Sequence, residues 1–209
     1  MTLQKEPWID TRLNQEEMNF LHKAILDENR KDTINSTSVF IQDKDNWFYN
    51  NVLKEISEYM YFKSSWPEYF DVNVVKSKAP PVFDLTRLWV NHQKQHEFNP
   101  PHQHQANYSF VVFMKIPTHW KEQHSLPLSV NSNHPCASDF QFLVGGPGPQ
   151  VKTTEIPLCP EDEGRMLFFP AWLSHQVFPF YECKEERITI SGNIVYNELE
   201  KNDETEKNS

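Results

Sequence analysis

The sequence predicts a mainly β domain with flanking N-terminal helices, closed into a double-stranded β-helix of the jelly-roll or cupin-like type. Three observations support this. Two segments with helical periodicity come first, roughly eight short strand candidates separated by turns follow, and no internal repeat or second-domain boundary interrupts them. We therefore expect one domain over residues 1–209. Residues 1–70 would form a helical support region, 85–197 the barrel, and 198–209 a frayed tail.

The N-terminal support region begins with a capping signal. Asn14 is followed three residues later by Glu17, the spacing of a capping box, and apolar residues then recur at helical intervals. This predicts an amphipathic helix over about 15–30. A similar apolar stripe predicts a second helix over about 46–62, and both helices would cover the outer face of a sheet.

After residue 72 the apolar pattern changes to the alternation of strands. The 118–137 segment shows no clear period, and we interpret it as a loop and a candidate substrate lid. The clearest six of the strand candidates are Leu85–Asn91, Tyr108–Met114, Asp139–Val144, Gln150–Pro157, Gly164–Pro170 and Ile188–Ser191.

Composition excludes several classes of protein. The 209 residues carry a formal net charge of −9, which argues against a non-specific nucleic-acid binder. No run of eighteen apolar residues predicts a membrane span, and the polar first thirty residues predict no signal peptide. Three widely spaced cysteines favour reduced thiols, so we expect a cytoplasmic protein. An apolar edge strand would permit a homodimer.

Three histidines form the strongest candidate site. His102 and His104 are two residues apart in an extended segment, so their side chains point to the same side and can bind one metal ion. His175 follows a Gly- and Pro-bounded strand about seventy residues later. Three protein ligands with open positions opposite are the arrangement that non-haem Fe(II) oxygenases use.

A polar strand face accompanies these histidines. Strict alternation puts Arg187, Thr189 and Ser191 on one face of the last strand. An arginine grips a carboxylate through two parallel hydrogen bonds, and a nearby hydroxyl can add a third. The pattern therefore predicts a pocket for a small anion inside the barrel.

Together these motifs resemble the Fe(II)/2-oxoglutarate-dependent oxygenase superfamily. The chain is most similar to the short prolyl-hydroxylase-like members of phage and marine bacteria, in which a Trp-x-Asn strand (Trp89 to Asn91) precedes a Pro-Pro-His-x-His segment. The resemblance covers roughly residues 85–197. It implies that His102 and His175 bind iron and that Arg187 pairs with the far carboxylate of 2-oxoglutarate.

One position departs from the superfamily pattern. The second ligand is normally Asp or Glu two residues after the first histidine, and His104 occupies that place. A three-histidine site, a site completed by Asn107, and a two-histidine site completed by water are all open. We favour His104, because a neutral imidazole is a competent ligand at this offset, although it leaves the iron centre one charge more positive.

The resemblance implies a dioxygenase that hydroxylates a peptidyl proline or small molecule while 2-oxoglutarate and O₂ become succinate and CO₂. Asn91 and Ser109, from neighbouring strands, are candidate co-substrate contacts beside Thr189 and Ser191. Two alternatives are a three-histidine cupin dioxygenase without 2-oxoglutarate and a non-catalytic ligand-binding barrel. Arg187 would have no assigned role in the cupin.

Overall fold

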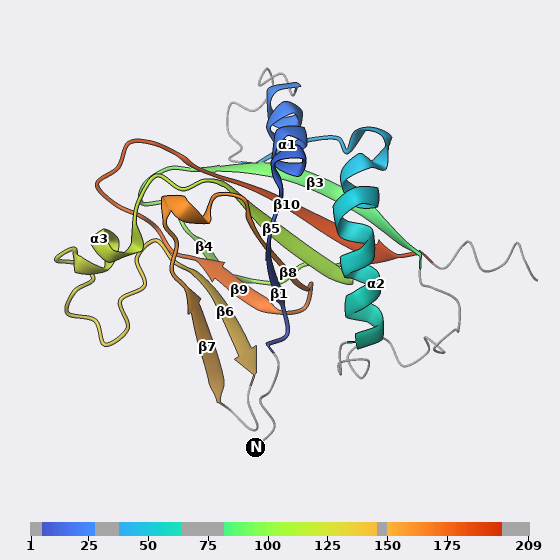
Figure 1. Ribbon diagram of the computed structural model, residues 1–209. Helices are drawn as coiled ribbons and strands as arrows, with labels where there is room; N and C mark the ends of the chain where they lie inside the picture. Colours follow the sequence, from blue (N-terminus) through green and yellow to red (C-terminus); the bar gives the residue numbers. More distant parts are fainter. Residues whose placement is uncertain (1–5, 28–37, 64–81, 146–149, 198–209) are drawn as a thin grey trace, which may run out of the picture.

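The computed structural model describes residues 6–27, 38–63, 82–145 and 150–197, which form two antiparallel sheets (Figure 1). The six-stranded sheet has the order β1-β8-β5-β10-β3-β2, and the four-stranded sheet the order β4-β9-β6-β7. The predicted 198–209 tail, the Gly145–Pro149 turn beyond Gly145, and the end of the first helix lie outside the described residues.

The six-stranded sheet contains both the longest strands and the N-terminal ones. Its members are β1 (Ile9–Arg12), β2 (Ser38–Phe40), β3 (Phe83–Gln93), β5 (Tyr108–Lys115), β8 (Arg165–Pro170) and β10 (Arg187–Tyr196). The four-stranded sheet consists of β4 (Asn99–His102), β6 (Phe140–Gly145), β7 (Val151–Ile156) and β9 (Ser174–Val177). The helical segments are α1 (Gln15–Asp27), η2 (Lys44–Asn46), η3 (Tyr49–Leu53), α2 (Lys54–Lys63), α3 (Trp120–Ser125) and η5 (Pro160–Asp162).

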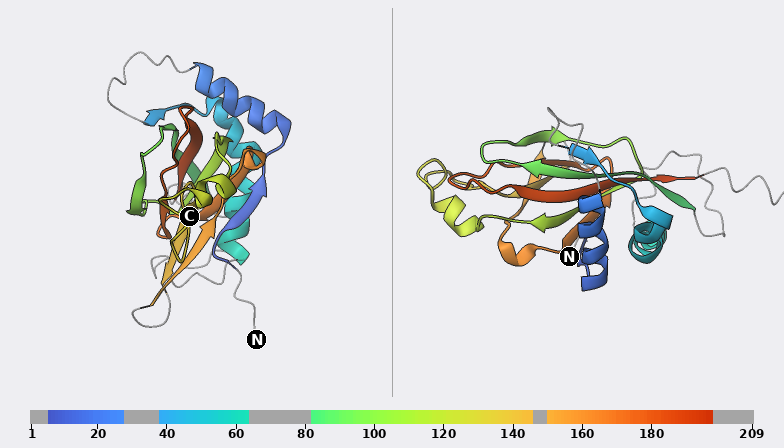
Figure 2. Two further views of the ribbon diagram at one scale, coloured as in Figure 1. Left: turned by 90° about the vertical axis from the view of Figure 1, so that its left-hand side faces the viewer. Right: turned by 90° about the horizontal axis from the view of Figure 1, so that it is seen from above.

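Helices α1 and α2 cover the outer face of the six-stranded sheet (Figures 1 and 2). Leu21 of α1 and Leu53 of η3 are fully buried in the same core cluster as Val112 of β5 and Ile190 of β10. The alternate residues of each strand point to this cluster, because successive side chains of a strand face opposite sides of the sheet. The helices thus bury an apolar face that the strands alone would expose.

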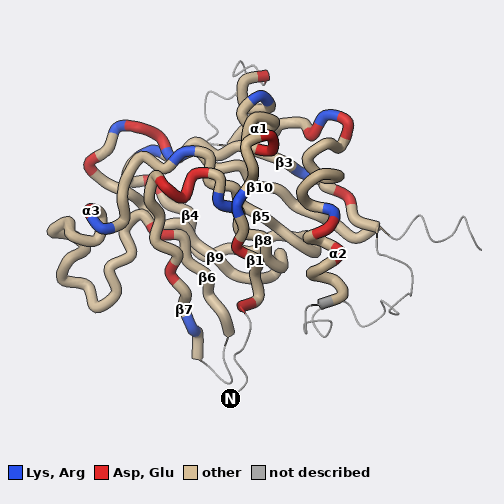
Figure 3. Tube along the Cα trace, viewed as in Figure 1, with Lys and Arg blue, Asp and Glu red and all other residues tan. Residues whose placement is uncertain are grey.

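The space between the two sheets is filled by a second, aromatic-rich cluster. Phe113 of β5 and Phe169 of β8 meet Phe140 and Phe142 of β6. Charged residues lie mostly on helices, loops and strand ends, so the middle of the barrel is largely uncharged (Figure 3). This is the closed two-sheet architecture that the strand pattern predicts, and the predicted fold class is confirmed.

Several local predictions need correction. Strands β1 and β2 were not expected within the supposedly helical first seventy residues, yet they pair with β8 and β3. The second helix begins with a π-helical turn (η3) before the regular α2. The predicted helix over about 46–62 is therefore present, but its spacing did not reveal the π-helical turn of five residues, Tyr49–Leu53.

The lid over 118–137 stays a prediction. This segment contains α3 and follows the last residue of β5, whereas His104 lies beside Ala171, near the opposite end of that sheet. Gln123 exchanges two hydrogen bonds with the backbone of Tyr181, at 2.8 and 3.0 Å, so the segment is fastened to the barrel.

No helix in the described part of the chain is long and apolar enough to cross a membrane.

Candidate metal centre and anion pocket

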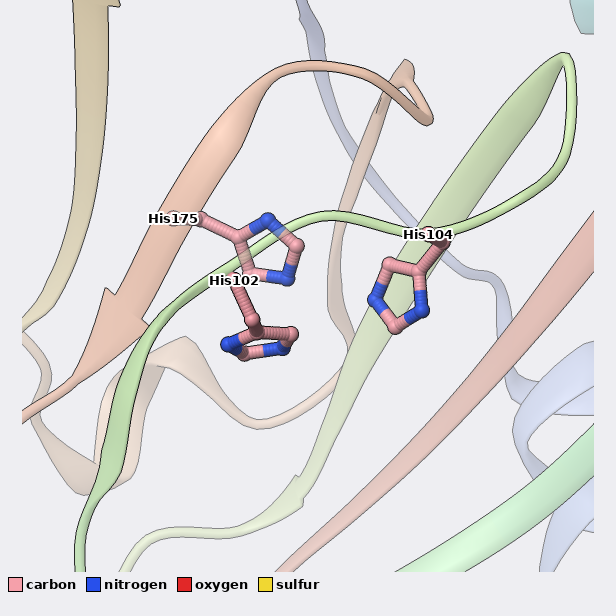
Figure 4. A group of neighbouring side chains, drawn as sticks. All are labelled: His102, His104 and His175. Carbon is pink, nitrogen blue, oxygen red and sulfur yellow. The ribbon is translucent and has the colours of Figure 1, made fainter.

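The three predicted histidines meet at one place (Figure 4). His102 ends β4, His175 lies on β9, and the two are direct partners in the antiparallel ladder. Their ring centroids are 4.3 Å apart, and the ring of His104 lies 5.3 Å from His102 and 5.2 Å from His175. One ligand nitrogen from each ring falls within 4.8 Å of the other two. That spacing suits a single metal ion.

Backbone carbonyls orient two of the rings. His175 Nδ1 lies 3.0 Å from the carbonyl oxygen of Leu173, and His102 Nδ1 lies 2.7 Å from that of Pro100. A carbonyl oxygen only accepts, so each Nδ1 carries the proton and donates it. The lone pair of each ring is therefore on Nε2, the tautomer that a metal ligand needs.

The surroundings of the histidines favour neutral rings. Burial lowers the pKa of His175 to about 3 and the pKa of His104 to about 4, with the neighbouring imidazoles adding a smaller effect in the same direction. His175 is enclosed by the rings of Phe140 and Phe169, at 5.5 and 4.9 Å. Both imidazoles are thus unprotonated near neutral pH, as metal ligands must be.

A cavity of about 600 Å³ extends from the histidines into the barrel. Its walls include all three histidines and Arg187, so the candidate metal ligands and the candidate anion-binding arginine line the same cavity. The other predicted residues in its lining are Trp89, Asn91, Thr189 and Ser191.

Arg187 is 1% exposed and is held from two sides. Its Nη2 donates to the backbone oxygen and to the hydroxyl of Ser138, at 2.7 and 2.6 Å, and its Nη1 donates to Gln93 Oε1 at 3.2 Å. Its Nε is buried and has no partner among the described residues. A buried donor without an acceptor is costly, so an anion in the cavity would satisfy a group that the protein leaves open.

Behind Arg187 lies an acidic residue that we did not predict. Asp139 is fully buried, and its Oδ1 is 3.0 Å from His124 Nε2. Burial raises the pKa of Asp139 to about 6, against the opposing effects of His124 and Arg187. His124 lies in the 118–137 segment, which the sequence predicts as a loop. The contact between His124 and Asp139 could not be predicted, because the fifteen residues that separate them include an aperiodic segment.

The predicted polar face is assembled by the strand register. Asn91 is opposite Thr189, Trp89 is opposite Ser191, and Gln93 is opposite Arg187. The Asn91 amide nitrogen donates weakly to the Thr189 and Ser191 hydroxyls, at 3.4 and 3.5 Å. Gln93 was missed, although the alternation through Trp89 and Asn91 extends directly to it.

Two other candidates lie away from the site. Ser109 is buried outside the cavity lining, and its hydroxyl donates to Asn193 Oδ1 at 2.9 Å, so its predicted contact with the co-substrate is wrong. The Asn107 amide oxygen accepts a 2.7 Å hydrogen bond from the backbone N–H of Tyr196. This bond links the turn before β5 to strand β10. Of the two candidates for the third ligand, His104 is the one beside His102 and His175.

Comparison with known proteins agrees with this geometry. The model of a 2OG-Fe(II) oxygenase family matches residues 87–193, about half of the sequence. The chain belongs to the 2OG-Fe(II) oxygenase family. It is therefore an oxygenase whose cofactors are Fe(II) and 2-oxoglutarate. No curated protein sequence matches it.

Solved structures share the fold at low identity. A 2OG-Fe(II) oxygenase family oxidoreductase from Burkholderia pseudomallei is 8% identical with a TM-score of 0.57, over 92% of this chain and 86% of that one. AviO1 from Streptomyces viridochromogenes Tue57 is 11% identical with a TM-score of 0.55, over 92% and 90%. The α-ketoglutarate-dependent epimerase SnoN of nogalamycin biosynthesis is 11% identical with a TM-score of 0.54, over 92% and 77%.

The residues present fit both cofactors. Three imidazoles, two of them with Nδ1 bonded to a backbone carbonyl, form a donor set for a divalent transition metal. Arg187 lines the same cavity, and its unpaired Nε–H can donate a hydrogen bond to a carboxylate there. A metal held by these three imidazoles would have no carboxylate ligand and therefore no negative protein ligand.

Proposed function

We propose that the protein is a 2-oxoglutarate-dependent hydroxylase with a three-histidine iron centre formed by His102, His104 and His175. The observation that carries the proposal is a single cavity that joins this cluster to a buried arginine with an unpaired donor. When bound, Fe(II) and 2-oxoglutarate would allow O₂ to react. One oxygen atom would enter succinate as 2-oxoglutarate loses CO₂, and the other would hydroxylate a C–H bond of the substrate.

The histidines would hold the metal with no negative protein charge. With His104 in place of a carboxylate, the Fe(II) site is one charge more positive than the usual site of the family. A dianionic co-substrate would compensate that charge. We therefore expect Fe(II) and 2-oxoglutarate to bind with strong mutual dependence, each raising the affinity for the other.

Arg187 would hold the far carboxylate of 2-oxoglutarate. The hydrogen bonds to Ser138 and Gln93 fix the guanidinium, so little side-chain entropy is lost when the anion binds. Thr189, Ser191 and Asn91 line the same cavity and would add hydroxyl and amide contacts.

The substrate would enter beside the β3–β4 connection. Phe98 in that connection lines the cavity and is 64% exposed, and Trp89 lies 5.8 Å from the His104 ring. Apolar and aromatic walls at the mouth of a polar cavity suit the C–H-rich part of a substrate. Peptidyl proline and small aliphatic molecules are accordingly the first substrates to test.

The first experiment adds Fe(II) and 2-oxoglutarate to the purified protein without O₂ and records the visible metal-to-ligand charge-transfer band. We expect a band in the wild type. In Arg187→Lys, 2-oxoglutarate affinity should fall on the order of tenfold to a hundredfold, because a charged hydrogen bond is lost. Arg165→Lys is the matched control, since Arg165 bonds to Asp10 and Asp162 outside the cavity.

Other results would replace the proposal. Bound iron without the band, and O₂ consumption that does not depend on 2-oxoglutarate, would favour a cupin-type dioxygenase. Absence of metal binding in the folded protein would favour a ligand-binding barrel. Equal loss of 2-oxoglutarate affinity in both arginine variants would remove the assigned role of Arg187.

A further inference from the structure

A second cluster of metal-ligating side chains lies outside the cavity. The ligand atoms of His119, Cys159 and Glu161 all fall within 4.8 Å of one another, the same closeness as in the three-histidine cluster. Among the described residues, these are the two groups of this kind. No part of the proposed hydroxylase mechanism uses the second one.

The side chains of the cluster come from two separate connections of the barrel. His119 follows β5 and precedes α3, whereas Cys159 and Glu161 belong to the β7–β8 connection around η5 (Figure 1). The backbone N–H of Trp120 donates to the oxygen of Leu158 at 2.9 Å, so the two connections are already held together beside the cluster.

The turn that carries the cysteine is fixed by its own hydrogen bonds. The backbone N–H of Asp162 donates to the oxygen of Cys159 at 2.9 Å, and the Cys159 N–H donates to Asp162 Oδ2 at 3.1 Å. Pro160 at the start of the turn restricts it further. Ligands on such a pre-formed turn lose little entropy when a metal binds.

The donor set selects a class of metal. One imidazole, one thiolate and one carboxylate are ligands of Zn²⁺ and similar borderline ions, whereas Ca²⁺ and Mg²⁺ prefer oxygen alone. Asp162 Oδ2 accepts from the Cys159 thiol at 3.2 Å, and a metal on the sulfur would replace this bond. We propose that His119, Cys159 and Glu161 form a second, zinc-type metal site that ties the β5–α3 and β7–β8 connections together.

Binding would require one local adjustment. His119 Nδ1 accepts a 3.1 Å hydrogen bond from the Lys121 N–H. A metal at Nδ1 would replace this bond, and a metal at Nε2 would move the ring proton to Nδ1. Either change costs one hydrogen bond on an exposed turn, which is small beside the binding free energy of structural zinc.

The test uses Co²⁺ as a probe, because a Co²⁺–thiolate bond gives a near-ultraviolet charge-transfer absorption that an all-histidine site cannot give. Metal-stripped, reduced full-length protein is titrated with Co²⁺. We expect this absorption in the wild type and in Cys183→Ser, and its loss in Cys159→Ser. A His102→Ala/His175→Ala variant, which lacks the first site, should retain it, so failure of the proposed hydroxylase function would leave this result unaffected.

Two more variants keep the result interpretable. His119→Ala and Glu161→Gln should each weaken Co²⁺ binding at least tenfold, and Zn²⁺ should displace Co²⁺ with loss of the absorption. Melting temperatures without metal show whether each variant is folded. The proposal is overturned if folded wild-type protein gives no thiolate absorption, or if the absorption persists in Cys159→Ser.

Discussion

At the scale of single residues, the identity of the third ligand is the sharpest question. His104 and Asn107 both follow His102 closely, but they do different things in the structure. The His104 ring faces the other two histidines, while the Asn107 side chain holds the Tyr196 backbone. These two roles make separable predictions.

We expect His104→Ala to weaken Fe(II) binding on the order of tenfold to a hundredfold, because it removes one of the three metal ligands. Its effect on stability should be small, because the His104 ring is partly exposed. Asn107→Ala should instead lower the free energy of unfolding by about 1–3 kcal/mol and leave Fe(II) affinity unchanged, since a backbone donor loses its acceptor. Isothermal titration and urea unfolding measure the two quantities. Tight iron binding by His104→Ala would contradict the three-histidine centre.

Gly192 gives a second prediction at this scale. A Cβ atom there would lie 2.5 Å from the Phe110 ring and 2.9 Å from the Arg87 backbone oxygen. Gly192→Ala should therefore destabilise the protein by roughly 1–3 kcal/mol, the cost of overpacking a core. Gly145→Ala is the control, because a Cβ atom there would meet none of the described residues within 4 Å. This substitution should change stability by less than about 0.5 kcal/mol. Equal urea midpoints for both variants would disprove this account.

The residues of the site were predictable where spacing alone defines a face. Alternation on two strands was enough to group Arg187 with Thr189 and Ser191, and Trp89 with Asn91. Ser109 was predicted wrongly because it lies directly opposite Asn193 in the β5–β10 ladder and its hydroxyl is bonded to that side chain, a pairing that depends on the register of the two strands. Asp139 and His124 could not be predicted, since their contact depends on how an aperiodic loop folds.

At the scale of elements, the capping box before α1 is a local signal that determines a boundary. The Asn14 side chain accepts from the Glu17 N–H at 3.0 Å, and the Glu17 carboxylate accepts from the Asn14 N–H at 2.8 Å. Both bonds are the ones that the sequence spacing predicts. Helix α1 therefore begins where we expected.

Removing this cap should cost a measurable amount of stability. We expect Asn14→Ala to lower the free energy of unfolding by about 1 kcal/mol, because one N–H of the first turn loses its acceptor. Gln15→Ala, which removes an exposed bond to Asn19 on the same turn, should cost less than about 0.5 kcal/mol. Chemical unfolding followed by circular dichroism compares the two. A smaller effect for Asn14→Ala than for Gln15→Ala would contradict the prediction.

Short edge strands were the elements that the sequence concealed. β1 and β2 have four and three residues, too few for alternation to be distinguished from chance. Their pairing is decided by the long strands β8 and β3 that they join. The long strands β3 and β10 were recognised only in part, over Leu85–Asn91 and Ile188–Ser191, and their full lengths of eleven and ten residues came from the structure.

At the scale of the whole molecule, the N-terminal region and the barrel share one core. Leu21, Leu53 and Met60 pack in the same cluster as Leu88 and Ile190. We infer that residues 1–70 and the barrel form one folding unit, as a single domain requires. One cooperative unfolding transition, seen alike by fluorescence and circular dichroism, is the expected result; two separated transitions would contradict it.

The buried carboxyl group of Asp139 makes the stability of that unit depend on pH. Its pKa in the folded protein is about 6, raised by burial from an ordinary value of 3.8. The folded state therefore holds the proton more tightly than the unfolded state. The stability from this group is fully present below about pH 4 and is lost as the pH rises through about 6.

An asparagine at this position mimics the protonated carboxyl group at every pH. Relative to the wild type, Asp139→Asn should thus gain stability between pH 4 and pH 6, by at least about 1 kcal/mol, and the difference should then level off. The size of the stability difference between variant and wild type also depends on the changed contacts to His124 and Arg187. The change of this difference with pH is therefore the quantity that tests the prediction. Urea unfolding of both proteins from pH 4 to pH 8 measures it. A difference that falls with rising pH would contradict the prediction and would mean that Asp139 is held as a carboxylate beside Arg187. A constant difference would mean that the pKa of Asp139 is the same in the folded and unfolded states.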